Sequence, residues 1–211
     1  MKRKNHEITL PDGYSEVYHI NALDTKTGLI FNLIALFVLG IVMLVALLPF
    51  FLGAREFVFD PLIYFICCSV FLVAMILYMV LHELVHGAAY KALTGEKLTF
   101  GLSWNCAFCG VPNIYVYRRA SLIALVSPFI VFTLLLIPLT VWMYFIHPFA
   151  YIMCAALLGT HIGGCSGDLY LTILFLFKLR DNTLLMRDTG PEQFFYKKTE
   201  CGIDVKENEE A

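Results

Sequence analysis

Four long apolar stretches are the feature of this sequence that most limits how it can fold. They cover residues 29–52, 62 to beyond 86, 122–146 and 149–177. A helix needs about 20 residues to cross the hydrocarbon core of a bilayer, so each stretch is long enough. Only 15% of the residues are charged, against about 25% in soluble proteins, and 59% are hydrophobic. The sequence therefore predicts an all-α integral membrane protein with about four transmembrane helices.

Several local signals bear on how these stretches are bounded. Pro128 and Pro138 are expected to kink the third stretch, and the His147-Pro148 pair marks the turn before the fourth. The first 27 residues are polar, and the first apolar stretch is too long for a signal-peptide core, so we expect no cleavable signal peptide. The length of the chain favours one compact membrane domain with short tails.

Basic residues are distributed very unevenly among the predicted loops. Of the 15 Lys and Arg residues, only Arg55 lies between the first and second stretches or between the third and fourth. Because loops rich in Lys and Arg stay in the cytoplasm, both termini and the 91–119 loop are predicted to face the cytoplasm. The net charge of −2 gives no reason to expect nucleic-acid binding.

A His-Glu-x-x-His motif lies in the second stretch, after a run without any charged residue from position 61 to position 81. His82 and His86 are four residues apart, so both imidazoles fall on one face of a helix and can reach one zinc ion. Glu83, between them, can hold a metal-bound water and act as a base. Ionisable groups are costly in an apolar span, which favours a functional site over histidines that merely satisfy backbone carbonyls.

Asp168 is the only acidic residue besides Glu83 in the four apolar stretches. His82 lies nine residues before Lys91, and Asp168 lies ten residues before Lys178. At 1.5 Å per residue, both sites lie about 14–15 Å from basic anchors on the same side of the membrane. The two polar sites are therefore predicted to reach a similar depth, where a divalent cation would compensate the carboxylate.

A catalytic zinc ion takes three protein ligands and leaves one position for water. Asp168 is the favoured third ligand, and His161 and Cys165 are the alternatives. We expect His161 to support a ligand or the fold, and Cys165 to be a packing residue. The glycines at positions 163, 164 and 167 allow another backbone to approach closely.

The 91–119 loop carries the pattern of a short β-hairpin. Residues 98–108 alternate between apolar and small or polar types, residues 110–113 supply a turn, and residues 114–117 form a second strand. Such a hairpin could bind an extended peptide by strand addition, or it could plug the cytoplasmic face. Cys106 and Cys109 form a lone C-x-x-C that lacks further zinc ligands nearby, and we expect reduced, partly buried thiols.

Together these motifs resemble site-2-protease-type intramembrane zinc metalloproteases. More closely, the chain resembles a bacterial family of unknown function described as zincin peptidases, over residues 10–179. The matching stretches are residues 10–14, residues 82–87, the hairpin with its cysteines, and residues 163–170. Site-2 proteases usually place the aspartate just before a glycine, whereas here Gly167 precedes Asp168.

The resemblance implies His82, His86 and Asp168 as ligands of Zn²⁺, with Glu83 as the catalytic base. It implies a peptidase. Our hypothesis is hydrolysis of peptide bonds in membrane-associated proteins or peptides, near the cytoplasmic side of a bacterial cell membrane. The expected organisation is a cytoplasmic segment at 1–27, a metalloprotease-like membrane domain at 28–180 and a cytoplasmic tail at 181–211.

Two alternatives come from other classes of protein. One is a non-catalytic membrane protein that binds or transports a divalent metal, and the other is a pseudoprotease that serves as a scaffold. Four spans are few for a transporter unless it oligomerises, and the sequence does not indicate an oligomeric state. Transport also has no need for a glutamate beside two ligating histidines.

Overall fold

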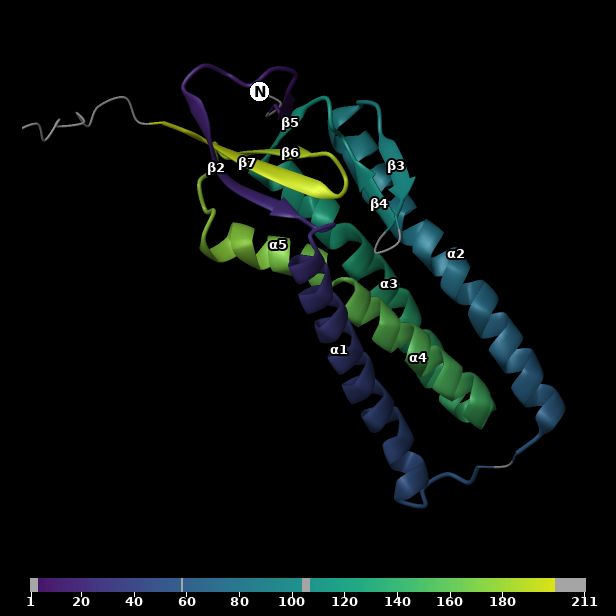
Figure 1. Cartoon of the computed structure of the whole chain (residues 1–211). Helices are drawn as coiled ribbons and strands as arrows, with labels where there is room; N and C mark the ends of the chain where they lie inside the picture. Colours follow the sequence, from purple (N-terminus) through teal and green to yellow (C-terminus); the bar gives the residue numbers. More distant parts are fainter. Residues whose placement is uncertain (1–3, 58, 104–106, 200–211) are drawn as a thin grey trace, which may run out of the picture.

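Long apolar helices make up most of the protein, as the sequence predicts (Figure 1). The structure, a computed structural model, describes residues 4–57, 59–103 and 107–199. The helices are α1 (Thr25–Phe51), α2 (Pro61–Thr94), α3 (Arg118–Ile146), α4 (Pro148–Gly164) and α5 (Ser166–Phe177). By length and composition α1, α2 and α3 can each cross a membrane, and α4 with α5 can do so as one bent pair.

Helix α2 is long because its ends are well capped and nothing inside it breaks the helix. The Asp60 carboxylate accepts hydrogen bonds from the amides of Leu62 and Ile63, and Pro61 begins the first turn. Gly95 ends the helix with a positive φ of 75°. Its 34 residues extend about 51 Å at 1.5 Å per residue, well beyond a hydrocarbon core of about 30 Å. The helix therefore reaches the strands at one end of the molecule.

The fourth predicted span is two helices that meet at Cys165 with a bend of 42°. This corrects the expectation of one continuous helix. Gly163 and Gly164, just before the bend, lack the side chains that would stiffen a helix. Helix α4 runs beside α1 and α3, whereas α5 turns away to lie under the strands (Figure 1).

Close packing of α4 on α1 explains part of the glycine pattern. A Cβ atom at Gly163 would lie 2.6 Å from the Ala35 carbonyl oxygen, and one at Gly159 would lie 2.9 Å from the Leu39 side chain. Small residues four apart are typical of helices that pack closely in membranes. By contrast, Gly164 has open space where its side chain would be. The expected close approach is thus confirmed at Gly163 alone among the three glycines of residues 163–167.

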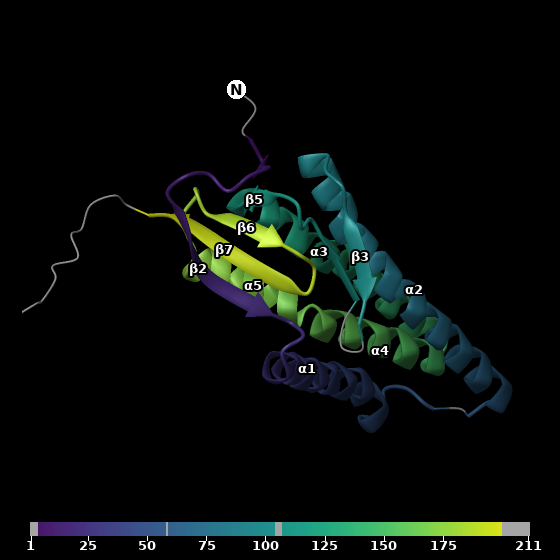
Figure 2. The ribbon, with the colours of Figure 1, turned by 45° about the horizontal axis from the view of Figure 1, so that its top comes forward.

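A five-stranded antiparallel sheet covers α5 at one end of the helices (Figures 1 and 2). Its strands, in spatial order, are β1 (His6–Glu7), β5 (Tyr115–Tyr117), β6 (Leu185–Asp188), β7 (Glu192–Lys198) and β2 (Tyr14–Asn21). Phe175 of α5 packs against Phe195 of β7 in the core beneath it, with ring centroids 5.4 Å apart. The all-α prediction is therefore incomplete, because segments expected to be tails supply β1, β2, β6 and β7.

The predicted short hairpin exists, but both of its strands lie within residues 99–110, most of which were predicted to form a single strand. Strands β3 (Thr99–Leu102) and β4 (Ala107–Gly110) pair with each other, whereas β5 pairs with β1 and β6 in the larger sheet. The alternating pattern runs without a break from residue 98 to residue 108, so it gives no sign of a turn between the two strands. Cys106 of the predicted C-x-x-C lies outside the described residues.

Candidate metal centre

One face of α2 carries a row of four buried side chains with a spacing of four residues. Tyr78, His82, His86 and Tyr90 are all buried on the side of the helix that faces the rest of the protein. A spacing of four residues places side chains one above the other on one helix face. The two histidines of the motif are therefore the centre of a longer polar row, whose ends are tyrosines.

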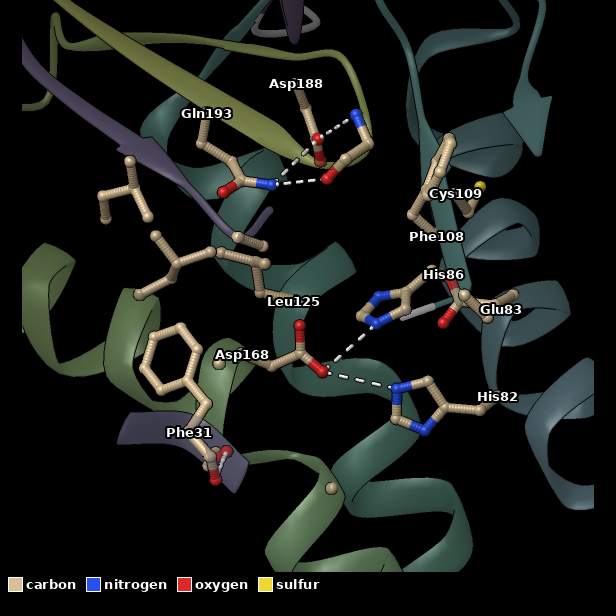
Figure 3. A pocket seen from close by; sticks show the side chains of 18 of the residues that line it. Phe31, His82, Glu83, His86, Phe108, Cys109, Leu125, Asp168, Asp188 and Gln193 are labelled. Atoms are coloured by element: carbon tan, nitrogen blue, oxygen red, sulfur yellow. Dashed lines mark hydrogen bonds and ion pairs between the residues drawn. The ribbon is translucent and has the colours of Figure 1, made fainter. Parts of the chain in front are cut away.

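Three potential ligand atoms converge at the middle of this row. The Nε2 atoms of His82 and His86 each lie 3.3 Å from the same oxygen of Asp168, Oδ2 (Figure 3). Ligand bonds of about 2.0–2.1 Å in a tetrahedral zinc site place neighbouring ligand atoms about 3.3 Å apart. The residues present thus fit a zinc ion in both chemistry and spacing.

His86 is held in the tautomer that a metal requires. Its Nδ1 lies 2.9 Å from the carbonyl oxygen of Ala124 in α3, and only a protonated Nδ1 can donate to that oxygen. In a neutral imidazole, Nε2 then keeps its lone pair. A carbonyl that accepts from the second ring nitrogen is the usual way in which a ligating histidine is oriented.

The bend at Cys165 positions Asp168. This carboxylate lies in the first turn of α5, immediately after the bend, and points back toward α2 (Figure 3). The first turn of a helix favours negative charge because of the helix dipole. The side chain of Asp168 is 21% exposed, against 11% for His82 and 8% for His86, so the carboxylate is the most accessible member of the group.

A second group of possible ligands lies beside the first and shares His82. It consists of His82, His161 and Cys165, all buried. His161, on α4, does not reach the group that contains Asp168. The phenolic oxygen of Tyr78 lies within hydrogen-bond distance of both imidazoles, 3.1 Å from His82 and 3.0 Å from His161.

A cavity of about 210 Å³ opens onto the three converging atoms. Its walls come from α1, α2, α5, β4 and the turn between β6 and β7. Glu83 lines this cavity, and among the described residues its carboxylate has no hydrogen-bond or ion-pair partner. In the part of the chain that the structure describes, no side chain therefore competes with a water molecule or a substrate for the carboxylate of Glu83.

The roof of the cavity is formed where the short hairpin meets the larger sheet. A side chain at Gly101 or at Gly190 would collide with the ring of Phe108, because each Cβ would lie 2.2 Å from that ring. Gly190 also has a φ of 100°, which disfavours other residues. The Val111 amide donates to the backbone oxygen of Asp188 at 2.9 Å. The two glycines thus let Phe108 lie over the cavity.

Asp188, a buried carboxylate on the sheet side of the cavity, was not among the site residues predicted from the sequence. It accepts hydrogen bonds from the Tyr90 hydroxyl at 2.7 Å, from the Gly190 amide at 2.9 Å and from the Gln193 amide at 3.4 Å. Burial raises the pKa of Asp188, and these three hydrogen bonds oppose that rise. The position of Tyr90, four residues after His86, was the signal that could have pointed to this contact.

The cysteine of the hairpin that the structure describes is a poor ligand. Cys109 is buried in β4, and burial raises the pKa of its thiol to about 12. Only a thiolate binds metal or attacks a disulfide, and such a thiol is almost wholly protonated at neutral pH. Cys109 is a free thiol, as expected, but it is buried rather than partly buried.

Residues 75–183, just over half of the chain, match the sequence profile of a family described as "putative zincin peptidase". The matched region contains the two histidines, Glu83 and Asp168, but it ends before Asp188. No curated protein and no solved structure matches the chain.

Proposed function

The chain belongs to the zincin peptidase family, and from this membership and its geometry we propose a zinc peptidase that cleaves membrane-associated substrates near the cytoplasmic side. The observation that carries the proposal is the convergence of two imidazole nitrogens on one carboxylate oxygen, each at 3.3 Å, beside a glutamate without a partner among the described residues. Membership of the family indicates a metallopeptidase, and the proposal adds the ligands, the base and the location.

In the proposed site His82, His86 and Asp168 would hold the zinc ion. A bound zinc ion supplies Lewis acidity, which makes water more acidic and polarises a carbonyl group. Glu83 takes a proton from the attacking water and passes it to the nitrogen of the departing amine. The carboxylate of Glu83 lines the cavity, where it can reach both the water and the departing amine.

Strand β4 is the proposed guide for the substrate. It pairs with β3 along one edge, and its residues 107–109 line the cavity that also contains Glu83. An extended peptide could add to the opposite edge of β4 through main-chain hydrogen bonds. A helical peptide has its amides bonded internally, so cleavage would require local unwinding, and an added strand would keep the unwound segment extended.

The membrane location rests on the apolar helices and the distribution of charge. Helices α1, α2 and α3 are long and apolar enough to span a bilayer, and side chains such as Leu36, Phe65 and Leu134 are exposed on them. With the basic segments in the cytoplasm, the sheet and the cavity would lie at the cytoplasmic end of the helices. Substrates would then be membrane proteins or peptides that enter from that side.

Replacement of Glu83 by glutamine tests the proposal. We expect E83Q to bind zinc in a 1:1 ratio, like the wild type, and to lose at least about 100-fold in hydrolysis, because proton transfer contributes about 10²–10⁴-fold to catalysis. E96Q, in the exposed loop after α2, is the matched control. Zinc content of the purified proteins and comparison of membrane proteomes from cells that carry each variant are the measurements. Wild-type protein without zinc, or identical proteomes for E83Q and wild type, would contradict the proposal.

A further inference from the structure

A continuous run of polar contacts leads from His82 away from the cavity and into the helix bundle. The Nδ1 atom of His82 lies 3.1 Å from the Tyr78 hydroxyl, which lies 3.0 Å from Nδ1 of His161. The other ring nitrogen of His161, Nε2, lies 3.1 Å from the Thr133 hydroxyl. The run thus crosses from α2 to α4 and then to α3. His161 has no exposed surface and Tyr78 is 8% exposed.

The direction of these hydrogen bonds follows from the atom that faces the metal site. Nε2 of His82 faces Asp168 and needs a lone pair for a metal, so Nδ1 carries the proton and donates to the Tyr78 oxygen. Tyr78 then donates its single hydroxyl proton to Nδ1 of His161. His161 consequently carries its proton on Nε2 and donates to Thr133. Every ring nitrogen has one role, and the roles agree along the whole run.

The same cluster could be read as a second metal site, because His82, His161 and Cys165 lie close together. The position of Tyr78 argues against that reading. Its hydroxyl is at hydrogen-bond distance from both imidazoles. The hydroxyl donates to the Nδ1 lone pair of His161 and accepts from the protonated Nδ1 of His82. The thiol of Cys165 lies 3.7 Å from the same nitrogen of His161. With the hydroxyl in place, neither imidazole offers an Nδ1 lone pair to a second ion.

We propose that Tyr78 and His161 are positioning residues, which hold His82 in the tautomer and orientation that bind the metal. This inference rests on the proposed zinc site and adds the groups that prepare one of its ligands. Rotation of the His82 ring away from the cavity would break its bond to Tyr78 and leave buried donors and acceptors unpaired. Such unpaired groups are costly in an apolar bundle, so the run restricts His82 to one orientation.

The two ligating histidines are thus oriented in different ways. His86 donates to a single backbone carbonyl, that of Ala124, which no substitution of a side chain removes directly. His82 depends on side chains throughout. Loss of a partner that orients a zinc ligand lowers metal affinity about 10–100-fold, so the contribution of Tyr78 can be measured without an assay of peptide hydrolysis.

The test is the zinc affinity of the purified full-length protein in detergent, measured by competition with a chelator. We expect Y78F to bind zinc about 10–100-fold more weakly than wild type. Y64F, at the other end of α2, is the matched control and should bind like wild type. T133V should show a smaller loss in the same direction, because Thr133 acts only through His161. The absorption spectrum of the cobalt-substituted protein should change in Y78F and not in Y64F, since the orientation of His82 changes.

Replacement of His161 separates a positioning role from simple packing. Glutamine can both accept from Tyr78 and donate to Thr133, whereas leucine can do neither. H161Q should therefore keep more zinc affinity than H161L. Equal affinities of these two variants, when both are folded and monodisperse, would contradict a positioning role.

The remaining outcomes distinguish this inference from the proposed function. If wild-type protein binds no zinc, the proposed function fails, and the inference fails with it. If wild type binds zinc and Y78F binds it equally tightly, only the inference is overturned. Two zinc ions per chain in wild type, reduced to one in C165S, would overturn it in favour of a second metal site.

Discussion

The two ends of the polar row on α2 use the same residue type for different purposes. Tyr90 donates to the carboxylate of Asp188, which belongs to the sheet, and Tyr78 contacts the neutral imidazole of His161 inside the helix bundle. Each tyrosine is four residues from a histidine of the motif. The first ties the C-terminal strands to α2, whereas the second contacts a proposed ligand directly.

The difference between the partners follows from their surroundings. An isolated carboxylate is very costly in the apolar interior of a helix bundle, whereas a neutral imidazole needs only hydrogen-bond partners. Asp188 lies on the sheet, where the Gly190 amide and the Gln193 side chain also donate to it. Tyr90 can therefore bond a carboxylate of the sheet, Asp188, whereas the partners of Tyr78 inside the bundle are neutral groups.

Removal of the carboxylate between the two ends should have the largest effect. D168A deletes one of the three proposed ligands, so zinc affinity should fall by at least about 100-fold, more than the loss of an orienting partner causes. D181A, in the exposed loop after α5, is the control. Chelator competition measures both. If D168A keeps wild-type zinc affinity, the centre of the row is not the metal site, and Tyr78 and Tyr90 do not flank one.

Y90F and Y78F should separate stability from metal binding. Hydrogen bonds to charged groups contribute about 1.5–3 kcal/mol, so Y90F should lower the free energy of unfolding of the metal-free protein by about that amount. Its zinc affinity should stay at the wild-type value, unlike that of Y78F. Denaturant titration in micelles and chelator competition measure the two quantities. If Y90F weakens zinc binding as much as Y78F does, the two ends have no separate roles.

The pH dependence of stability offers a third way to compare the two ends of the row. Because burial raises the pKa of Asp188 above its unfolded value of about 3.9, the folded state holds this proton more tightly than the unfolded state. The contribution of Asp188 to stability is therefore greatest at acid pH and is lost as pH rises through the folded-state pKa. D188N cannot titrate, so wild type should lose stability relative to D188N as pH rises from about 4 toward neutrality. Unfolding curves at several pH values measure this, and parallel curves would contradict it.

The smallest expected effect concerns the thiol beside the sheet end of the row. The thiol of Cys109, with a pKa of about 12, is protonated at neutral pH, so C109A should keep the zinc content and zinc affinity of wild type. Metal analysis of the purified variant measures this. Loss of zinc from C109A would show that the sheet end also takes part in metal binding.

Much of the helical part could be predicted because each signal is local. Residues 29–52 or 122–146 need only their own hydropathy to be recognised, and the spacing of His82 and His86 is a property of one helix. Asp168 could be associated with them because charge bias and helix rise place it at the same depth. The structure brings these three side chains together.

The sheet could not be predicted, because its pairings depend on distant parts of the chain. Tyr14 pairs with Lys198, and β1 has only two residues, too few for any pattern. The alternation across residues 98–108 concealed the end of β3 and the start of β4. Tyr78 and Tyr90 were overlooked because tyrosines in an apolar helix resemble ordinary core residues until their partners are known.

Packing between α5 and the sheet has a consequence for the biosynthesis of the protein. The helix that carries Asp168 is held from the other side by Phe195 in β7, near the C-terminal end of the described chain. The ribosome must therefore synthesise β7 before α5 can take its final place. We expect Asp168 to reach its place beside His82 and His86 only after the last strand of the sheet has joined.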